Sequence, residues 1–264
     1  MTLQRTPLYD RHVSAGARMV EFGGWEMPVQ YTGIIDEHNT VRNAAGLFDI
    51  SHMGEFELRG PDALAFLQHV ITQDIASIPE GQSNYGLLCR PDGGIVDDVF
   101  VYHLPDMYLV VVNASNIDKD FTWMQQYASQ FDVDFSNASE QYAMLALQGP
   151  TAESILAQCT DIDALGLPFH AVTHGRLLGD IPALIARTGY TGEDGFELFV
   201  APEYAARLWD GLLEKGREAG LKPAGLGARD SLRFEACLAL YGHEIADDIN
   251  PYEARLGWVV KLNK

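Results

Sequence analysis

The stretch that decides the fold is a turn followed by a long strand, Arg90-Pro-Asp-Gly-Gly-Ile-Val-Asp-Asp-Val-Phe-Val-Tyr-His103. Proline presets φ and glycine tolerates positive φ, so residues 91–94 predict the turn. The β-branched and aromatic residues after the turn favour a strand. Successive side chains of a strand point to opposite faces, so Asp97 and Asp98 are predicted to face opposite sides of a sheet.

These two carboxylates interrupt a strand that is otherwise apolar on both faces, a pattern typical of a strand covered on both sides. A carboxylate buried there costs free energy unless it meets a partner or a ligand, and functional sites retain such groups. The competing interpretation places the acids at the solvated mouth of a hairpin. The pattern alone leaves both interpretations of Asp97 open.

The rest of the chain mixes hairpins with amphipathic helices. Such mixing favours an α+β fold with antiparallel sheets over a doubly wound parallel fold. Hairpins are predicted between residues 95–103 and 108–113, and between 184–187 and 196–200. Helices are predicted over residues 34–45, 118–131 and 228–241, the last of them ended by Gly242.

A strand followed by a proline-started helix occurs three times, over residues 57–67, 146–156 and 197–208. Proline suits the first turn of a helix, since its missing N–H has no partner there in any case. The recurrence predicts a duplicated strand–helix unit.

Composition excludes several classes of function. The formal net charge of −19 over 264 residues disfavours a nucleic-acid partner, because phosphate binding needs clustered Lys and Arg. The three cysteines have no CxxC spacing, so neither a zinc site nor a disulfide framework is predicted, and a reducing compartment fits. No apolar signal core or membrane-length stretch is present, so we expect a soluble, cytoplasmic protein with no membrane partner.

Other candidate residues keep two interpretations each. Backbone N–H groups of the glycine-rich loop 189–195 could approach an anion, or the loop is a plain hairpin turn. Glu197 in the next strand is either solvated or part of a site. Arg229 and Arg233 lie one helical turn apart, where they could clamp a carboxylate or pair with acids of their own helix. The histidines show no metal-binding spacing, so no metal is predicted.

Ordered motifs along nearly all of the chain resemble those of the glycine cleavage system T-protein family, the aminomethyltransferases. They include Phe48-Asp-Ile-Ser-His-Met53, Gly93-Gly-Ile-Val-Asp-Asp98, Thr188-Gly-Tyr-Thr-Gly-Glu-Asp-Gly195 and Gly227-Ala-Arg-Asp-Ser-Leu-Arg233. The resemblance implies the aminomethyltransferase folate-binding fold. It implies two intertwined α+β subdomains, approximately residues 1–50 with 140–264, and residues 51–139.

The resemblance also implies an activity in glycine catabolism. Tetrahydrofolate, the co-substrate, accepts the aminomethyl carbon from the lipoyl arm of the partner H-protein, giving methylenetetrahydrofolate and ammonia. The family's catalytic acid corresponds to Asp97, and its folate-contacting residues correspond to Glu197 and Arg229. Further residues implied to line the folate pocket are Tyr190, Met53, Tyr85, Tyr102 and Asn113.

One departure from the family pattern affects the expected activity. Family members continue for roughly another hundred residues, about one small domain. A C-terminal β-barrel is therefore expected to be missing after Lys264. Three alternatives to the transferase follow: a non-catalytic folate-binding module, a truncated inactive fragment, or a folate-dependent demethylase of the same superfamily.

Overall fold

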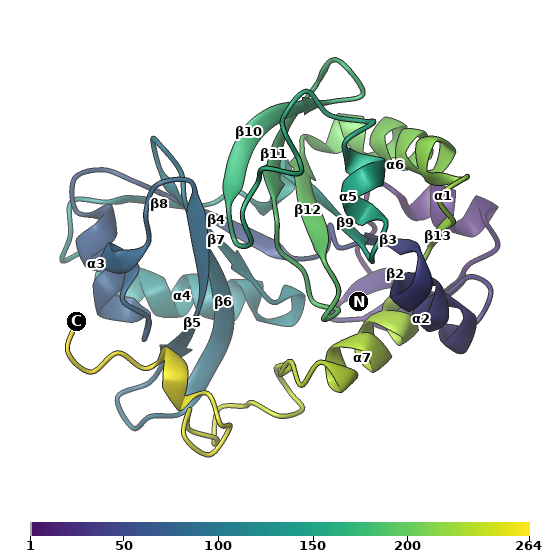
Figure 1. Ribbon diagram of the computed structural model, residues 1–264. Helices are drawn as coiled ribbons and strands as arrows, with labels where there is room; N and C mark the ends of the chain where they lie inside the picture. Colours follow the sequence, from purple (N-terminus) through teal and green to yellow (C-terminus); the bar gives the residue numbers. More distant parts are fainter. Residues whose placement is uncertain (1) are drawn as a thin grey trace. The chain divides into compact units, whose positions relative to one another are not determined.

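The computed structural model describes residues 2–264, which form two compact units (Figure 1). The first unit holds Met1–His52 and Glu140–Leu238, and the second holds Met53–Ser139 and Ala239–Lys264. The sequence-based division grouped residues 239–264 with the first unit instead. Here Ile245 and Val259 join an apolar cluster with Leu87 and Ile95 of the second unit, which accounts for the difference.

The first unit contains a six-stranded sheet in the order β10-β11-β12-β9-β3-β13. Its strands are β10 (Val172–Leu177), β11 (Ile181–Ala186), β12 (Gly195–Val200), β9 (Ala143–Gln148), β3 (Ala45–Asp49) and β13 (Leu221–Pro223). All neighbours are antiparallel except β13 and β3. A two-stranded ribbon, β1 (Arg18–Phe22) with β2 (Trp25–Gln30), completes its strands.

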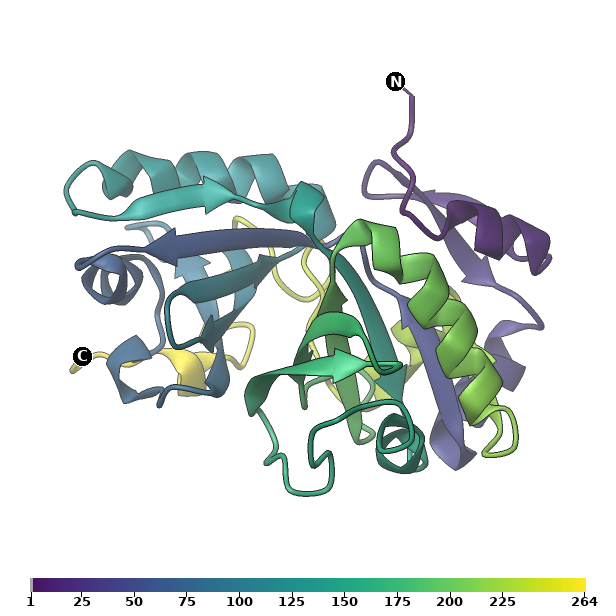
Figure 2. The same ribbon diagram turned by 90° about the horizontal axis from the view of Figure 1, so that it is seen from above.

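Helices cover this sheet and bury its apolar side chains. They are α1 (Tyr9–Ser14), α2 (Ile34–Asn43), α5 (Ala152–Leu156), α6 (Pro202–Gly216) and α7 (Leu226–Glu235). Leu208 and Leu212 of α6 pack with Leu145, Leu147 and Phe196 of the sheet in one buried cluster. Figure 2 shows the ribbon of α6, in light green, beside the strands of this sheet. Alternate residues of β9 thus point at α6, as the period of two in a strand requires.

The second unit is built on a five-stranded antiparallel sheet in the order β5-β6-β7-β4-β8. The strands are β5 (Gln82–Cys89), β6 (Ile95–His103), β7 (Tyr108–Val112), β4 (Gly54–Arg59) and β8 (Asp134–Asn137). The helices are α3 (Ala63–Val70) and α4 (Ile117–Ala128), with the short turns η1 (Ile75–Ser77), η2 (Ala114–Asn116) and η4 (Gly257–Val259). One more turn, η3 (Ser139–Gln141), lies where the chain leaves this unit.

One face of the five-stranded sheet packs on α3 and α4. Phe56, Val101 and Val110 of the sheet share a buried cluster with Phe66 of α3 and Met124 of α4. The sheets with their packed helices confirm the predicted α+β class with antiparallel sheets, including the predicted hairpins of β6 with β7 and of β11 with β12.

The predicted helix over residues 228–241 is wrong at its end, because α7 stops at Glu235. Cys237 takes a left-handed φ of 57°. The N–H of Leu238 then donates to the carbonyl of Arg233 at 2.9 Å, which closes the helix. This closure is the one usually made with glycine, so a cysteine there gave no sequence signal.

Candidate functional site

Asp97 is fully buried in β6, so the interpretation that placed it at a solvated hairpin mouth is wrong. Its Oδ1 accepts hydrogen bonds from Asn113 Nδ2 at 2.9 Å and Asn116 Nδ2 at 2.8 Å, and its Oδ2 accepts from the Asn113 N–H at 3.1 Å. These donors fix the orientation of the carboxylate. Asn116 caps α4, so Asp97 also lies where a helix N-terminus favours an anion.

Asp98 is tied to Asp97 by one amide. Asn113 Nδ2 donates to Asp98 Oδ1 at 2.7 Å as well as to Asp97, and Tyr85 donates its hydroxyl to Asp98 Oδ2 at 3.2 Å. Burial first, and then the charge of Asp97, raise the pKa of Asp98 to about 7. Two adjacent carboxylates with different environments are the usual arrangement for separating charge stabilisation from proton transfer. The sequence predicted Asp98 as one of two acids in the strand, but only Asp97 was named as a candidate catalytic residue.

Of the remaining predicted residues of the second unit, Tyr85 contacts this pair. Tyr85 is the cross-strand partner of Phe100, so its side chain shares a sheet face with Asp98 and Tyr102. Tyr102 is fully buried, and the Tyr85 ring stacks on Trp258 at 5.9 Å. Met53, half-buried, directly precedes β4.

In the first unit the structure brings Tyr190 and Arg229 together. The Arg229 guanidinium carbon lies 4.3 Å from the centre of the Tyr190 ring, a cation–π contact. Glu197, on β12, accepts a hydrogen bond from the Thr188 hydroxyl at 2.5 Å. Buried His52 belongs to the same unit; burial first, and then the charge of Arg229, lower the pKa of His52 to about 4.

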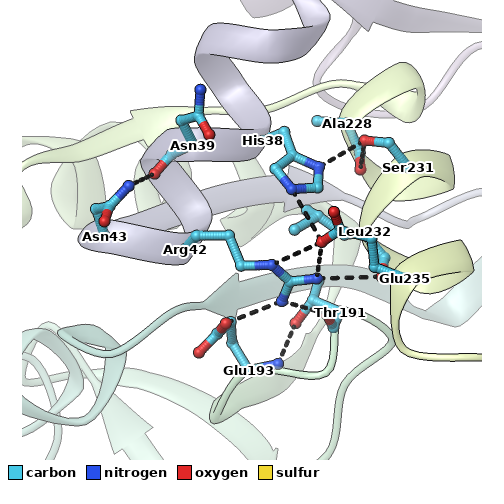
Figure 3. A network of polar contacts seen from close by, with 10 residues as sticks. All are labelled: His38, Asn39, Arg42, Asn43, Thr191, Glu193, Ala228, Ser231, Leu232 and Glu235. Atoms are coloured by element: carbon cyan, nitrogen blue, oxygen red, sulfur yellow. Dashed lines mark hydrogen bonds and ion pairs between the residues drawn. The ribbon is translucent and has the colours of Figure 1, made fainter.

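The loop that carries Tyr190 is held by Arg42, a residue that sequence reasoning missed (Figure 3). Arg42 Nη1 donates to the Thr191 carbonyl at 2.8 Å and to Glu193 at 2.9 Å. Its Nη2 donates to Glu235 of α7 at 3.0 Å and to the Leu232 carbonyl at 3.3 Å. One guanidinium thus joins α2, the glycine-rich loop and α7, the helix of Arg229. Arginine's fixed fork of donors suits this role.

The charged side chains of α7 pair only in part as one sequence interpretation held. Arg233 pairs with Asp230 of its own helix at 2.9 Å, as one alternative held. Glu235 instead meets Arg42 and, at 3.2 Å, His38 of α2. Both of its partners come from a segment nearly two hundred positions away in the chain, a pairing that no local pattern encodes.

The start of α7 is fixed by a buried carboxylate. Glu37 accepts hydrogen bonds from the backbone N–H groups of Tyr31 at 2.6 Å, Thr32 at 2.9 Å and Gly33 at 3.1 Å. It also accepts from the N–H of Gly225, the residue that caps α7, at 2.8 Å. These four bonds satisfy its charge and fix the position of the helix that bears Arg229.

Over residues 2–264, no group of three or more His, Cys, Asp or Glu side chains is arranged to hold a metal ion. Within the same residues, no helix has both the length and the apolar character needed to cross a membrane.

Comparison with known proteins identifies the family of this chain. The family model described as the GCVT N-terminal domain matches residues 8–264. An aminomethyltransferase of Herpetosiphon aurantiacus is 57% identical over 99% of this chain and 72% of its own length. One of Moorella thermoacetica is 56% identical with the same coverage.

A solved structure agrees with these relatives. The glycine cleavage system aminomethyltransferase T of Bartonella henselae matches with a TM-score of 0.91 and 38% identity, over 99% of this chain and 70% of that one. The chain therefore belongs to the glycine cleavage system T-protein family of aminomethyltransferases.

Proposed function

We propose that this aminomethyltransferase takes its one-carbon unit from the lipoyl arm of an H-protein and passes it to tetrahydrofolate. The products are methylenetetrahydrofolate, ammonia and the dihydrolipoyl carrier. The bond from carbon to sulfur and the bond from carbon to the amine nitrogen break, and two bonds from that carbon to the folate nitrogens N5 and N10 form. The two protons released by these nitrogens end on the sulfur and on ammonia.

The observation that carries this proposal is the carboxylate pair of β6. Asp97, the predicted catalytic acid, has three donors on its two oxygens and serves best as a fixed negative charge that stabilises a cationic one-carbon unit. Asp98, half-buried and with a pKa of about 7, is the better proton carrier at neutral pH. We therefore assign proton transfer to Asp98 and charge stabilisation to Asp97.

Folate recognition is proposed for the residues that the family pattern indicated. Glu197 accepts the donor edge of the pterin, and Arg229, over the Tyr190 ring, holds a polar or anionic part of the folate. Met53, Tyr85, Tyr102 and Asn113 are proposed to line the folate site. Aromatic side chains suit a flat ring, because they bury its faces.

The setting of the protein is part of the proposal. The cysteines Cys89, Cys159 and Cys237 are free thiols, which supports a cytoplasmic location. Nucleic acid and membranes are not expected partners, in keeping with the net charge of −19. We expect no metal in the reaction.

The test compares Asp97→Asn and Asp98→Asn in single-turnover transfer from an aminomethylated H-protein. Each variant should lose about 10²–10⁴-fold in rate, the usual range for a lost charge or proton carrier. Asp98→Asn should also lose the rate dependence near pH 7. Asp92→Asn is the matched control, because the Asp92 side chain is 72% exposed in the turn before β6.

Calorimetric titration of tetrahydrofolate separates binding from chemistry in the same proteins. We expect all three variants to bind folate, since Glu197 and Arg229 are unchanged. Binding without turnover by the unmodified chain would contradict the transferase and leave a non-catalytic folate-binding module. Full transfer activity in Asp98→Asn would contradict the role of that residue.

A further inference from the structure

A third acid lies next to the carboxylate pair, on the first turn of α4. Asp120 follows Asn116 by four residues, so both side chains lie on one face of the helix. Asn116 donates to Asp97 from that face. Asp120 is fully buried, and within residues 2–264 neither of its carboxyl oxygens has a hydrogen-bond partner.

An ionised carboxylate that is buried without a hydrogen-bond donor costs much free energy. The basic neighbour on the helix, Lys119, is engaged elsewhere. Its Nζ donates to the Val96 carbonyl at 2.6 Å and lies 3.8 Å from the centre of the Tyr241 ring. Burial first, and then the charge of Asp97, raise the pKa of Asp120 to about 11.

We propose that Asp120 stays protonated at neutral pH and donates its O–H to Asp97, as a positioning residue for the carboxylate pair. A protonated carboxyl has one O–H donor, and a carboxylate oxygen of Asp97 can accept a hydrogen bond from it. Asp97 then keeps its negative charge, with part of that charge offset by the Asp120 hydrogen. The consequence for catalysis rests on the proposed function, but the protonation state does not.

Other ionisable groups face this cluster from every neighbouring element. Asp98 and Asp97 come from β6, Tyr85 from β5 and Lys119 from α4. Tyr241 comes from the segment after α7, and burial together with a hydrogen bond to Asp247 raises its pKa. Lys119 is the one group among these that carries positive charge at neutral pH, and its contacts hold it on Val96 and Tyr241. A proton on Asp120 therefore keeps a further negative charge out of the cluster.

The experiment is a carbon-13 NMR titration of the whole chain labelled at the aspartate carboxyl carbons, between pH 5 and pH 9. We expect one buried carboxyl resonance at the position of a protonated acid throughout, absent from Asp120→Asn. Asp118→Asn, which removes an exposed acid of the same helical turn, should retain it. An Asp120 resonance at the ionised position, or one that titrates below pH 7, would overturn the proposal.

A second readout tests positioning rather than protonation. Asp120→Leu removes the donor but keeps the site neutral, so Asp98 experiences the full charge of Asp97, and its titration midpoint should rise above about 7. Asp120→Asn retains an N–H donor and should leave that midpoint closer to its original value. Equal midpoints in the leucine variant and the unmodified chain would refute the positioning role. These titrations need no transfer activity, so they stand even if the proposed function fails.

Discussion

The free energy of unfolding of Asp120→Asn should increase, relative to that of the unmodified chain, as pH rises. In the folded chain the pKa of Asp120 is raised to about 11, whereas an unfolded aspartate titrates near about 4. A raised folded pKa means that the stability is fully present below the unfolded pKa. It is then lost progressively as pH rises toward the folded pKa, because the fold must retain a proton that the unfolded chain releases.

The size of the effect follows from linkage. Between pH 5 and pH 9 the folded state holds one more proton than the unfolded state at this position. The unmodified chain should therefore lose about 1.4 kcal/mol per pH unit relative to Asp120→Asn, or about 5.5 kcal/mol over the four units. Asparagine has no proton to retain, and its amide has nearly the same shape and can still donate to Asp97.

Urea unfolding of both proteins at each pH unit measures this difference, followed by a probe in the second unit such as Trp258 fluorescence. Asp118→Asn controls for a change of net charge, because that side chain is exposed in the same turn. Its unfolding free energy should run parallel to that of the unmodified chain. Parallel curves for Asp120→Asn as well would refute the reasoning, because they would mean that Asp120 is ionised in the fold.

Three further outcomes are expected. Glu37→Gln should cost about 3 kcal/mol in urea unfolding, because the charged acceptor of four backbone N–H groups is lost; a cost below about 1 kcal/mol would contradict its role. Arg42→Lys should weaken tetrahydrofolate binding in calorimetry, because one ammonium cannot replace the fork that holds the Tyr190 loop to α7, and unchanged affinity would count against this. Cys237→Gly should raise the thermal midpoint by stabilising the fold by about 1 kcal/mol, because φ there is 57°, and a lower midpoint would argue against the cap.

Local chemistry allowed much of the fold to be predicted. The turn before β6 and the apolar strand after it encode a hairpin, and the antiparallel partners β7, β11 and β12 follow from the same patterns. The end of α7 was not predictable in this way. The chain leaves the helix at a left-handed cysteine, and left-handed backbone in a non-glycine residue has no sequence signature.

The candidate site, too, was predictable from the sequence only in part. The sequence by itself determined that two adjacent acids occupy an apolar strand, and its ordered motifs determined the family. Only the tertiary structure decided how these acids differ, because their hydrogen-bond partners Asn113, Asn116 and Tyr85 approach from other elements. Asp120 has the same dependence, since a carboxyl on an amphipathic helix looks solvated until packing removes water from it. Burial and the positions of hydrogen-bond donors are properties of the packed fold, and they set the pKa of a group more strongly than its neighbours in sequence do.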